Sequence, residues 1–234
     1  RTQSHPEWIV KALRQALVNH GRSGEELEAL LAADNADPEV TLCARPGLIA
    51  PEALAKDARK ADRVHDVEPR PGRISPLAVV MVGGDPGRIE AIRDCRAGVE
   101  DEGSQLVALV AAHAPVEGRD ARWLDLCAGP GGKAALLAAR AAQTGAQLLA
   151  NEVSPHRADL VRSALRAIAP DIARVRCGDG RDLGRDEPGA YDRVLVDAPC
   201  TGLGSLRRRP EARWRRQPQD VTVLAELQRE LLAS

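Results

Sequence analysis

Two short segments place chemically useful side chains close together along the chain. Asp197-Ala198-Pro199-Cys200 joins a carboxylate and a thiol through a rigid proline, and Gly129-Pro130-Gly131-Gly132-Lys133 is a glycine-rich segment that ends in a lysine. A cysteine thiolate is a nucleophile that can form covalent intermediates. Glycines let a ligand approach the backbone closely, and free N–H groups at the start of a helix bind anions. The sequence therefore predicts a ligand site and a candidate reactive thiol.

The glycine segment is not a Walker phosphate loop, which needs a glycine at the position of Cys127 and a serine or threonine at that of Ala134. It does satisfy the looser dinucleotide-binding pattern. Glu152 ends the next predicted strand, where a carboxylate can accept both hydroxyls of a ribose. The alternative is a tight strand-to-helix turn without a ligand. At this point NAD and S-adenosylmethionine both fit the pattern.

The ends of two later strands favour S-adenosylmethionine. The segment 178–182 (GDGRD) places Asp179 where an adenine amino group could be held, and Pro199-Cys200 follows the end of the fourth predicted strand. A nicotinamide enzyme does not need this thiol, whereas a pyrimidine C5 methyltransferase needs a thiolate that adds to C6 before C5 can attack a methyl group. Because a lone cysteine is more often an inert buried residue, the argument depends on its setting in Asp-Ala-Pro-Cys.

A parallel sheet is needed to bring these segments together. The predicted strands are Arg122–Cys127, Gln147–Glu152, Arg174–Cys177 and Arg193–Asp197, and the predicted helices are Gly103–Ala114, 133–142, Pro155–Ala169 and Asp220–Leu232. Strands that alternate with helices after a glycine turn are typical of a doubly wound sheet, in which ligands bind at the carboxyl ends of the strands. The predicted fold class is therefore α/β, with a Rossmann-like domain over residues 98–234.

Residues 1–97 predict a small α+β module before that domain. Helices are expected over 7–20, 24–33 and Pro51–Ala61, strands over Val40–Arg45 and Leu77–Val82, and a loop or linker over Asp66–Pro76. Turn residues such as Pro46-Gly47 stop these strands. The predicted organisation is therefore two domains, 1–97 and 98–234.

The composition excludes several classes of protein. With 234 residues and 44% hydrophobic content, the chain can bury a sizeable core, which excludes a disordered protein. Because 33 basic residues balance 34 acidic residues, binding to a polyanion must depend on local patches.

No apolar run approaches the ~18 residues of a membrane span. Five cysteines without C-x-x-C indicate neither a disulfide framework nor a zinc site, and we expect a reducing cytoplasm.

The strongest local patch is Arg207–Arg216, which contains six arginines, one glutamate and Trp214. Arginine is suited to phosphate groups, and an aromatic ring can stack on a base. A solvated loop and a core tryptophan are the alternatives. The residues predicted to bind RNA are Arg207, Arg208, Arg209, Arg213 and Trp214.

Six segments, in order, resemble the Sun or RsmB-like family of RNA cytosine-C5 methyltransferases. They are Ser4–Trp8, Val99–Gln105, Leu124–Lys133, Gly178–Arg181, Asp197–Gly202 and Arg207–Trp214. The resemblance covers most of the chain, and the ordered set is far more specific than any one segment. It implies methylation of cytosine C5 in RNA, specifically small-subunit ribosomal RNA, with S-adenosylmethionine as cofactor. It also implies that residues 1–97 are an RNA-recognition-like module.

The resemblance further implies a role for individual residues. Cys127–Lys133 would surround the methionine end of the cofactor, Glu152 would bind its ribose, and Asp179 would lie by its adenine. Asp197 would line both the cofactor and the target base, and Lys133 would help to orient the cytosine. The implied cofactor site is Cys127, Ala128, Gly129, Pro130, Gly131, Gly132, Lys133, Glu152, Arg157, Asp179 and Asp197. The implied catalytic residues are Cys200, Asp197 and Lys133.

One part of the family pattern is missing. In the family the attacking thiol comes from a Thr-Cys segment after the fifth strand, and the Pro-Cys thiol, here Cys200, assists release of the methylated product. No Thr-Cys occurs in these 234 residues, so we expect that the chain as it stands cannot complete the catalytic cycle. Three alternatives stay open. Cys200 could itself be the nucleophile, the protein could be an RNA-binding or assembly factor that retains the cofactor fold, or it could methylate a substrate other than RNA.

Overall fold

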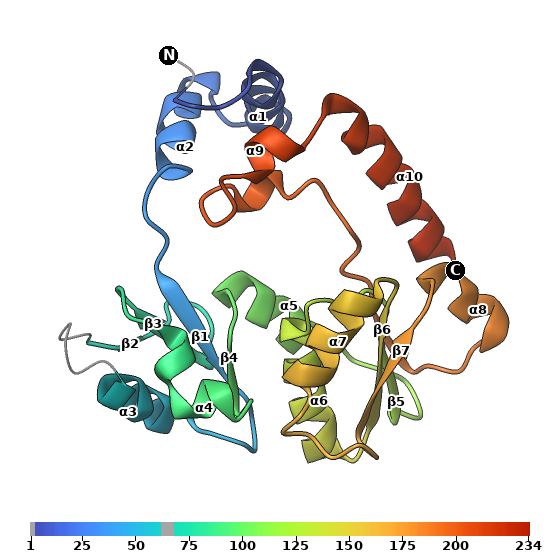
Figure 1. Cartoon of the computed structure of the whole chain (residues 1–234). Helices are drawn as coiled ribbons and strands as arrows, with labels where there is room; N and C mark the ends of the chain where they lie inside the picture. The colour runs from blue at the N-terminus through green and yellow to red at the C-terminus, as the bar shows by residue number, and fades with distance from the viewer. Residues whose placement is uncertain (1–2, 62–67) are drawn as a thin grey trace. The chain divides into compact units, whose positions relative to one another are not determined.

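The computed structural model describes residues 3–61 and 68–234, which form two compact units (Figure 1). One unit combines Arg1–Pro38 with Pro199–Glu230, and the other combines Glu39–Ala198 with Leu231–Ser234. Both β-sheets belong to the second unit. That unit therefore contains the glycine segment and Asp197, whereas Cys200 and the arginine-rich segment belong to the first.

A parallel sheet in the order β7-β6-β5-β8 forms the larger core of the second unit. Its strands are β5 (Arg122–Asp125), β6 (Gln147–Glu152), β7 (Ala173–Cys177) and β8 (Arg193–Leu195). The helices α5 (Glu102–His113), α6 (Gly132–Thr144) and α7 (Pro155–Ala164) cover one face (Figure 1). The core between them is mostly alanine and leucine, packed around Trp123. The α/β fold class predicted from the sequence is confirmed.

Two strands of this sheet end earlier than predicted, whereas β6 and β7 end at the predicted residues. β5 stops at Asp125 and β8 at Leu195, so the residues after each strand leave the sheet at its carboxyl edge. Helix α7 stops at Ala164 instead of Ala169, and turns follow it. Proline disfavours helical backbone in the residue before it, and Pro170 follows Ala169. After β7 come two short elements, η3 (Gly180–Asp182) and α8 (Leu183–Asp186), which the sequence did not predict.

An antiparallel sheet in the order β2-β3-β1-β4 forms the other core of this unit. Its strands are β1 (Val40–Ala44), β2 (Arg70–Pro71), β3 (Ala78–Met81) and β4 (Ala97–Val99), and the helices beside it are α3 (Pro51–Ala61), η2 (Pro86–Arg88) and α4 (Glu90–Arg93). β2 lies within the predicted loop, of which Asp66 and Val67 are outside the described residues. The domain boundary predicted between residues 97 and 98 passes through β4, and the division into two domains stays a prediction.

The first unit is helical. It contains α1 (Glu7–Asn19), η1 (Gly24–Glu26), α2 (Leu27–Ala33), η4 (Leu203–Ser205), α9 (Ala212–Arg215) and most of α10 (Pro218–Ala233). The buried apolar side chains among the described residues of this unit are Ile9, Leu27, Leu31 and Leu206. The N-terminal residues and the residues after Cys200 therefore fold together, which the sequence did not predict.

Candidate active site

The turn between β5 and α6 presents its backbone at the carboxyl edge of the parallel sheet. Gly131 precedes α6 with a φ of 112°, and a Cβ added there would lie 2.7 Å from the Cβ of Ala164. Both the positive φ and the close approach require glycine. The first N–H groups of α6 have no acceptor within the helix and carry the positive end of its dipole. This turn can therefore hold a polar or anionic group of a ligand.

Glu152, at the end of β6, is buried against this turn. Its Oε2 accepts a hydrogen bond of 3.0 Å from the N–H of Gly129, and its Oε1 accepts one of 3.0 Å from the N–H of Ser154. Arg157 lies 3.6 Å from Oε2 and also donates to the carbonyl of Gly129. Three residues predicted from separate segments thus meet. Each carboxylate oxygen keeps a second lone pair, with which Glu152 can accept a hydroxyl of a ligand.

The two predicted catalytic residues of this unit are in contact. Nζ of Lys133, in the first turn of α6, lies 2.8 Å from Oδ2 of Asp197, two residues after β8. The Lys133 side chain is 19% exposed and that of Asp197 is 51% exposed. The ammonium is therefore largely shielded while the carboxylate faces solvent, where a substrate can reach it.

Two further carboxyl groups lie near this ion pair, and no local pattern in the sequence pointed to them. Asp125 ends β5 and is 1% exposed, and burial raises its pKa to about 7. Glu100 follows β4, and its carboxyl carbon would lie 3.3 Å from a Cβ on Gly132. Burial also raises the pKa of Glu100 to about 7, although Lys133 and Arg45 oppose this. Both residues lie in segments that carried the family resemblance. Their burial depends on residues from other segments that pack around them, so the sequence alone did not indicate it.

Asp179, predicted to lie by an adenine, follows β7. It accepts a hydrogen bond of 3.0 Å from the N–H of Arg181, and the Arg181 guanidinium pairs with it at 2.6 Å, which lowers the pKa of Asp179. Asn151 joins the neighbouring strand ends, because its Nδ2 donates to the carbonyls of Leu126 at 3.0 Å and Gly178 at 3.1 Å. Asn151 is thus a positioning residue that the sequence did not reveal.

Cys127 lies in the glycine turn and is half-buried. Burial, followed by the carboxylates of Asp125, Glu152 and Asp197, raises the pKa of Cys127 to about 11. The thiol therefore stays protonated at neutral pH and is a poor nucleophile.

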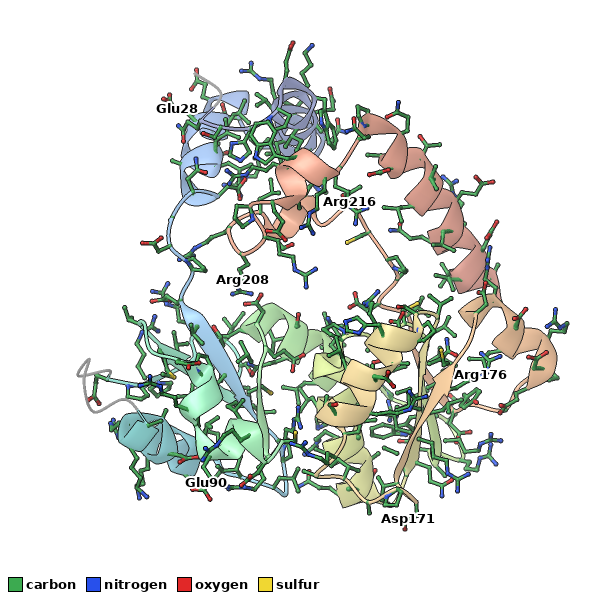
Figure 2. The ribbon with its side chains drawn as sticks, in the orientation of Figure 1. Glu28, Glu90, Asp171, Arg176, Arg208 and Arg216 are labelled. Carbon is green, nitrogen blue, oxygen red and sulfur yellow. The ribbon has the colours of Figure 1, made fainter. Side chains whose placement is uncertain are left out.

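Cys200 belongs to the helical unit and is exposed. Arg216 fixes the backbone around it, since it donates to the carbonyls of Thr201 at 3.1 Å and Cys200 at 3.3 Å (Figure 2). Gln228 donates to the carbonyl of Pro199 at 2.8 Å. These two side chains hold the segment that presents the thiol, a role that no local pattern in the sequence indicated.

Most of the residues predicted to bind RNA are exposed. They are Arg207, Arg208, Arg209 and Trp214, whose indole is not part of a core because Trp214 is 65% exposed. Arg213 differs, because it is 5% exposed and donates to Oδ1 of Asn35 at 2.7 Å and to the carbonyl of Asp34 at 2.8 Å. Since its guanidinium is buried in these contacts, we leave Arg213 out of the proposed RNA surface.

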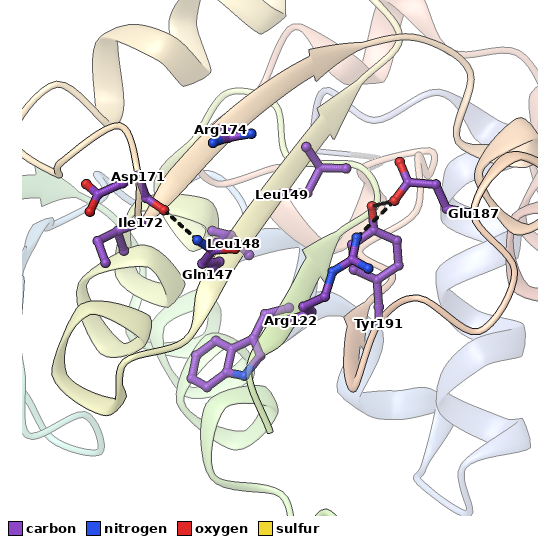
Figure 3. Close-up of a pocket in the computed structure, with 10 residues that line it drawn as sticks. Arg122, Gln147, Leu148, Leu149, Asp171, Ile172, Arg174, Glu187 and Tyr191 are labelled. Carbon is purple, nitrogen blue, oxygen red and sulfur yellow. Dashed lines mark hydrogen bonds and ion pairs between the residues drawn. The ribbon is translucent and has the colours of Figure 1, made fainter. Parts of the chain in front are cut away.

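A pocket of about 190 Å³ lies at the opposite, amino end of the parallel strands (Figure 3). Arg122 stacks over the Tyr191 ring at 5.1 Å and pairs with Glu187 at 3.1 Å, and the Tyr191 hydroxyl donates to Glu187 at 2.9 Å. These charged groups are paired with one another. None of the predicted site residues lines this pocket.

Within the described ranges, no group of three or more His, Cys, Asp or Glu is arranged to hold a metal ion. In the same part of the chain, no helix has both the length and the apolar character that crossing a membrane requires. All five cysteines are free.

Comparison with known proteins decides the family. The family described as 16S rRNA methyltransferase RsmB/F matches residues 111–234, just over half of the chain. The chain belongs to this family. A putative methyltransferase of Mycobacterium tuberculosis is 54% identical over 231 residues, which are 99% of this chain and 47% of the relative. The probable ribosomal RNA small subunit methyltransferase B of Bacillus subtilis is 30% identical over 98% of this chain and 48% of its own length. The chain thus spans about half the length of these curated relatives.

Two solved structures show the same fold. NSun6 from Pyrococcus horikoshii with SFG has a TM-score of 0.80 at 15% identity, covering 99% of this chain and 79% of that chain. A methyltransferase homolog protein from the same organism has a TM-score of 0.70 at 18% identity, covering 95% of this chain and 71% of that chain. These two structures confirm the predicted Rossmann-like fold, and the matching family model confirms the resemblance to this family.

Membership of this RsmB/F family also confirms S-adenosylmethionine as the cofactor. The residues at the carboxyl edge of the sheet fit such a group. Because Gly129 and Gly131 carry no side chains, the turn can lie directly against Glu152 and against Ala164 of α7. The buried Oδ1 of Asp125 has no hydrogen-bond partner among the described residues, and a donor group of a ligand would satisfy it.

Proposed function

We propose that this chain acts in the methylation of cytosine C5 in RNA, specifically in small-subunit ribosomal RNA. The observation that carries the proposal is the contact between Lys133 and Asp197 at the mouth of the glycine turn, with Cys200 three residues further along the chain. Membership of the RsmB/F family supports the same class of substrate.

The chemistry assigns each of these residues a task. Cytosine C5 is a weak nucleophile until a thiolate adds to C6, and the bound cofactor supplies the electrophilic methyl group. The Lys133 ammonium can donate to the base and the Asp197 carboxylate can accept from it, so together they orient the ring. After methyl transfer the proton on C5 is lost and the thiol is expelled from C6. We assign Cys200 to this release step, because the family takes its attacking thiol from a Thr-Cys segment, which these 234 residues do not contain.

The exposed arginines supply the proposed RNA surface. Arg207, Arg208 and Arg209 would contact phosphates, and Trp214 would stack on a base. Their exposure supports this assignment, although Arg207 also donates to the carbonyl of Asp37 at 2.6 Å.

The alternative is an RNA-binding or assembly factor that retains the cofactor fold, and the exposed Arg207, Arg208 and Arg209 fit it equally well. The gene that encodes this sequence can be deleted, and nucleosides from ribosomal RNA can then be measured by mass spectrometry. Loss of one 5-methylcytidine, restored by the intact gene, would support the methyltransferase. An unchanged 5-methylcytidine content together with retained RNA binding by the purified protein would support the assembly factor, and no RNA binding at all would point to a substrate other than RNA.

A further inference from the structure

Carboxyl groups outnumber cations at the start of α6. Glu100, Asp125 and Asp197 all lie close enough to Lys133 to interact with its charge, and Asp197 forms the 2.8 Å ion pair. Arg45 is the other cation near Glu100, but its guanidinium donates to the carbonyls of Cys95 and Ala164. The site therefore holds more potential negative charge than its own cations neutralise.

Glu100 and Asp125 each keep one oxygen buried without a partner. Oε1 of Glu100 and Oδ1 of Asp125 make no hydrogen bond to any part of the chain that the structure describes. A buried oxygen without a partner makes the ionised form of a carboxyl group costly, so such a group either takes up a proton or needs a cation. Because burial raises the pKa of both groups to about 7, the two states are close in free energy at neutral pH.

The groups that face the two carboxyls come from both sheets and from α6. Those facing Glu100 are Cys43, Arg45, Lys133, Asp197 and Asp125, and those facing Asp125 are the Cys127 N–H and thiol, Lys133, Asp197 and Glu100. The Cys43 thiol stays neutral, because burial raises its pKa far above the usual range. Among these groups, Lys133 and Arg45 are the cations, and Arg45 is held by the carbonyls of Cys95 and Ala164. These groups are not arranged to hold a metal ion.

We propose that Glu100 and Asp125 select the methyl donor over its demethylated product by charge, and that binding of the donor releases a proton from this carboxyl pair. S-adenosylmethionine carries a sulfonium and an ammonium against one carboxylate, whereas S-adenosylhomocysteine has lost the sulfonium charge. An ionised pair favours the ligand with the extra positive charge, and by linkage that ligand favours ionisation of the pair. The proposal depends on the cofactor and not on the RNA target.

Calorimetric titration of the 234-residue chain tests this. Affinities for S-adenosylmethionine and S-adenosylhomocysteine would be measured at pH 6, 7 and 8, in buffers with different heats of ionisation, so that released protons are counted. We expect the preference for the methyl donor to grow on the order of tenfold from pH 6 to pH 8. Release of about one proton changes the affinity about tenfold for each pH unit over which the release takes place. Below pH 7 we expect the donor, but not the product, to release a proton.

The variants Glu100→Gln and Asp125→Asn should each reduce both the proton release and the pH dependence of the preference. Glu28→Gln is the matched control, because it also removes one carboxylate, at an exposed position on α2 (Figure 2). It should leave the proton release and the pH dependence of the preference unchanged. Thermal melts identify a variant that fails to fold, and Glu100→Gln, at a half-buried position, is the less disruptive test.

A preference that is equal at pH 6 and pH 8, or that both variants retain in full, would overturn the proposal. Failure to bind either ligand would overturn it together with the cofactor assignment, whereas lost RNA methylation with intact binding would affect the proposed function alone.

Discussion

The guanidinium of Arg45 donates a hydrogen bond of 2.7 Å to the carbonyl of Ala164, the last residue of α7. Arg45 directly follows β1 in the antiparallel sheet, and Ala164 packs against Gly131 in the glycine turn. One buried side chain therefore ties the antiparallel sheet to the helix that supports the cofactor turn.

Replacing Arg45 with alanine should destabilise this unit. The change leaves the carbonyls of Cys95 and Ala164 without their donor and opens a cavity, and we expect the free energy of unfolding to fall by about 2–4 kcal/mol. Urea unfolding followed by circular dichroism measures the loss. Arg14→Ala, an exposed change on α1, should cost less than about 0.5 kcal/mol. Equal losses of unfolding free energy for the two variants would contradict the proposed link between the antiparallel sheet and α7.

Gly131→Ala should abolish measurable binding of the cofactor. The new Cβ would meet Ala164 at 2.7 Å and the Cα of Val161 at 3.1 Å, at a φ of 112°. Gly118→Ala is the matched control, because Gly118 also has a positive φ, of 84°, but open space around it. Both changes carry backbone strain of about 1–3 kcal/mol, so only the clash distinguishes them. Binding by Gly131→Ala at the affinity of Gly118→Ala would show that the turn tolerates a side chain.

The unfolding free energy should depend on pH through Glu100 and Asp125. Folding raises the pKa of these groups to about 7 from ordinary values of 4.5 and 3.8. Between about pH 4 and pH 7 the folded state binds more protons than the unfolded state, so stability falls as pH rises, by on the order of 3 kcal/mol for each group. Denaturant unfolding from pH 4.5 to 8 should therefore show a flatter profile for Glu100→Gln than for the unaltered chain. Parallel profiles would contradict the raised pKa of Glu100.

Cys200 should react with iodoacetamide much faster than Cys127 at pH 7.5. Cys200 is exposed, whereas Cys127 is half-buried and its pKa is raised to about 11, so little of it is thiolate. Peptide mapping by mass spectrometry after short exposures separates the two sites. Comparable rates would contradict the raised pKa of Cys127, which burial and then the nearby carboxylates produce.

Arg209→Ala and Arg213→Ala should have different effects. Arg209 is exposed, and its loss should reduce the salt dependence of RNA binding by about one unit of slope without changing the melting temperature. Arg213 is buried against Asn35 and Asp34, and its loss should lower the melting temperature. Fluorescence anisotropy with a ribosomal RNA fragment at several salt concentrations, together with thermal melts, checks both. An unchanged slope for Arg209→Ala would count against the RNA surface.

Local patterns in the sequence predicted the parallel sheet well. β6 and α3 have the predicted ends, and Lys133, Asp197, Glu152 and Gly129 meet at the carboxyl edge as the order of strands implied. The reason is that each strand end is marked by its own glycines or acids, and the crossover rules for parallel strands place those ends together.

The sequence did not predict properties that depend on distant neighbours. Arg213 belongs to a basic run, but its burial depends on Asp34 and Asn35, far away along the chain. The roles of Glu100 and Asp125 likewise arise from desolvation, which no local pattern encodes. Strand β4 has three residues and lacks the length of a recognisable pattern, and it exists because β1 offers it an edge to pair with.

The hydrogen bond from Arg213 to Asn35 closes a loop of 178 residues. During synthesis α1 and α2 therefore leave the ribosome long before the residues that cover them, so this unit cannot finish folding until translation has passed Arg213. An expression clone trimmed to begin at Glu39 would still encode both sheets, yet it would remove the packing partners of the segment that carries Cys200.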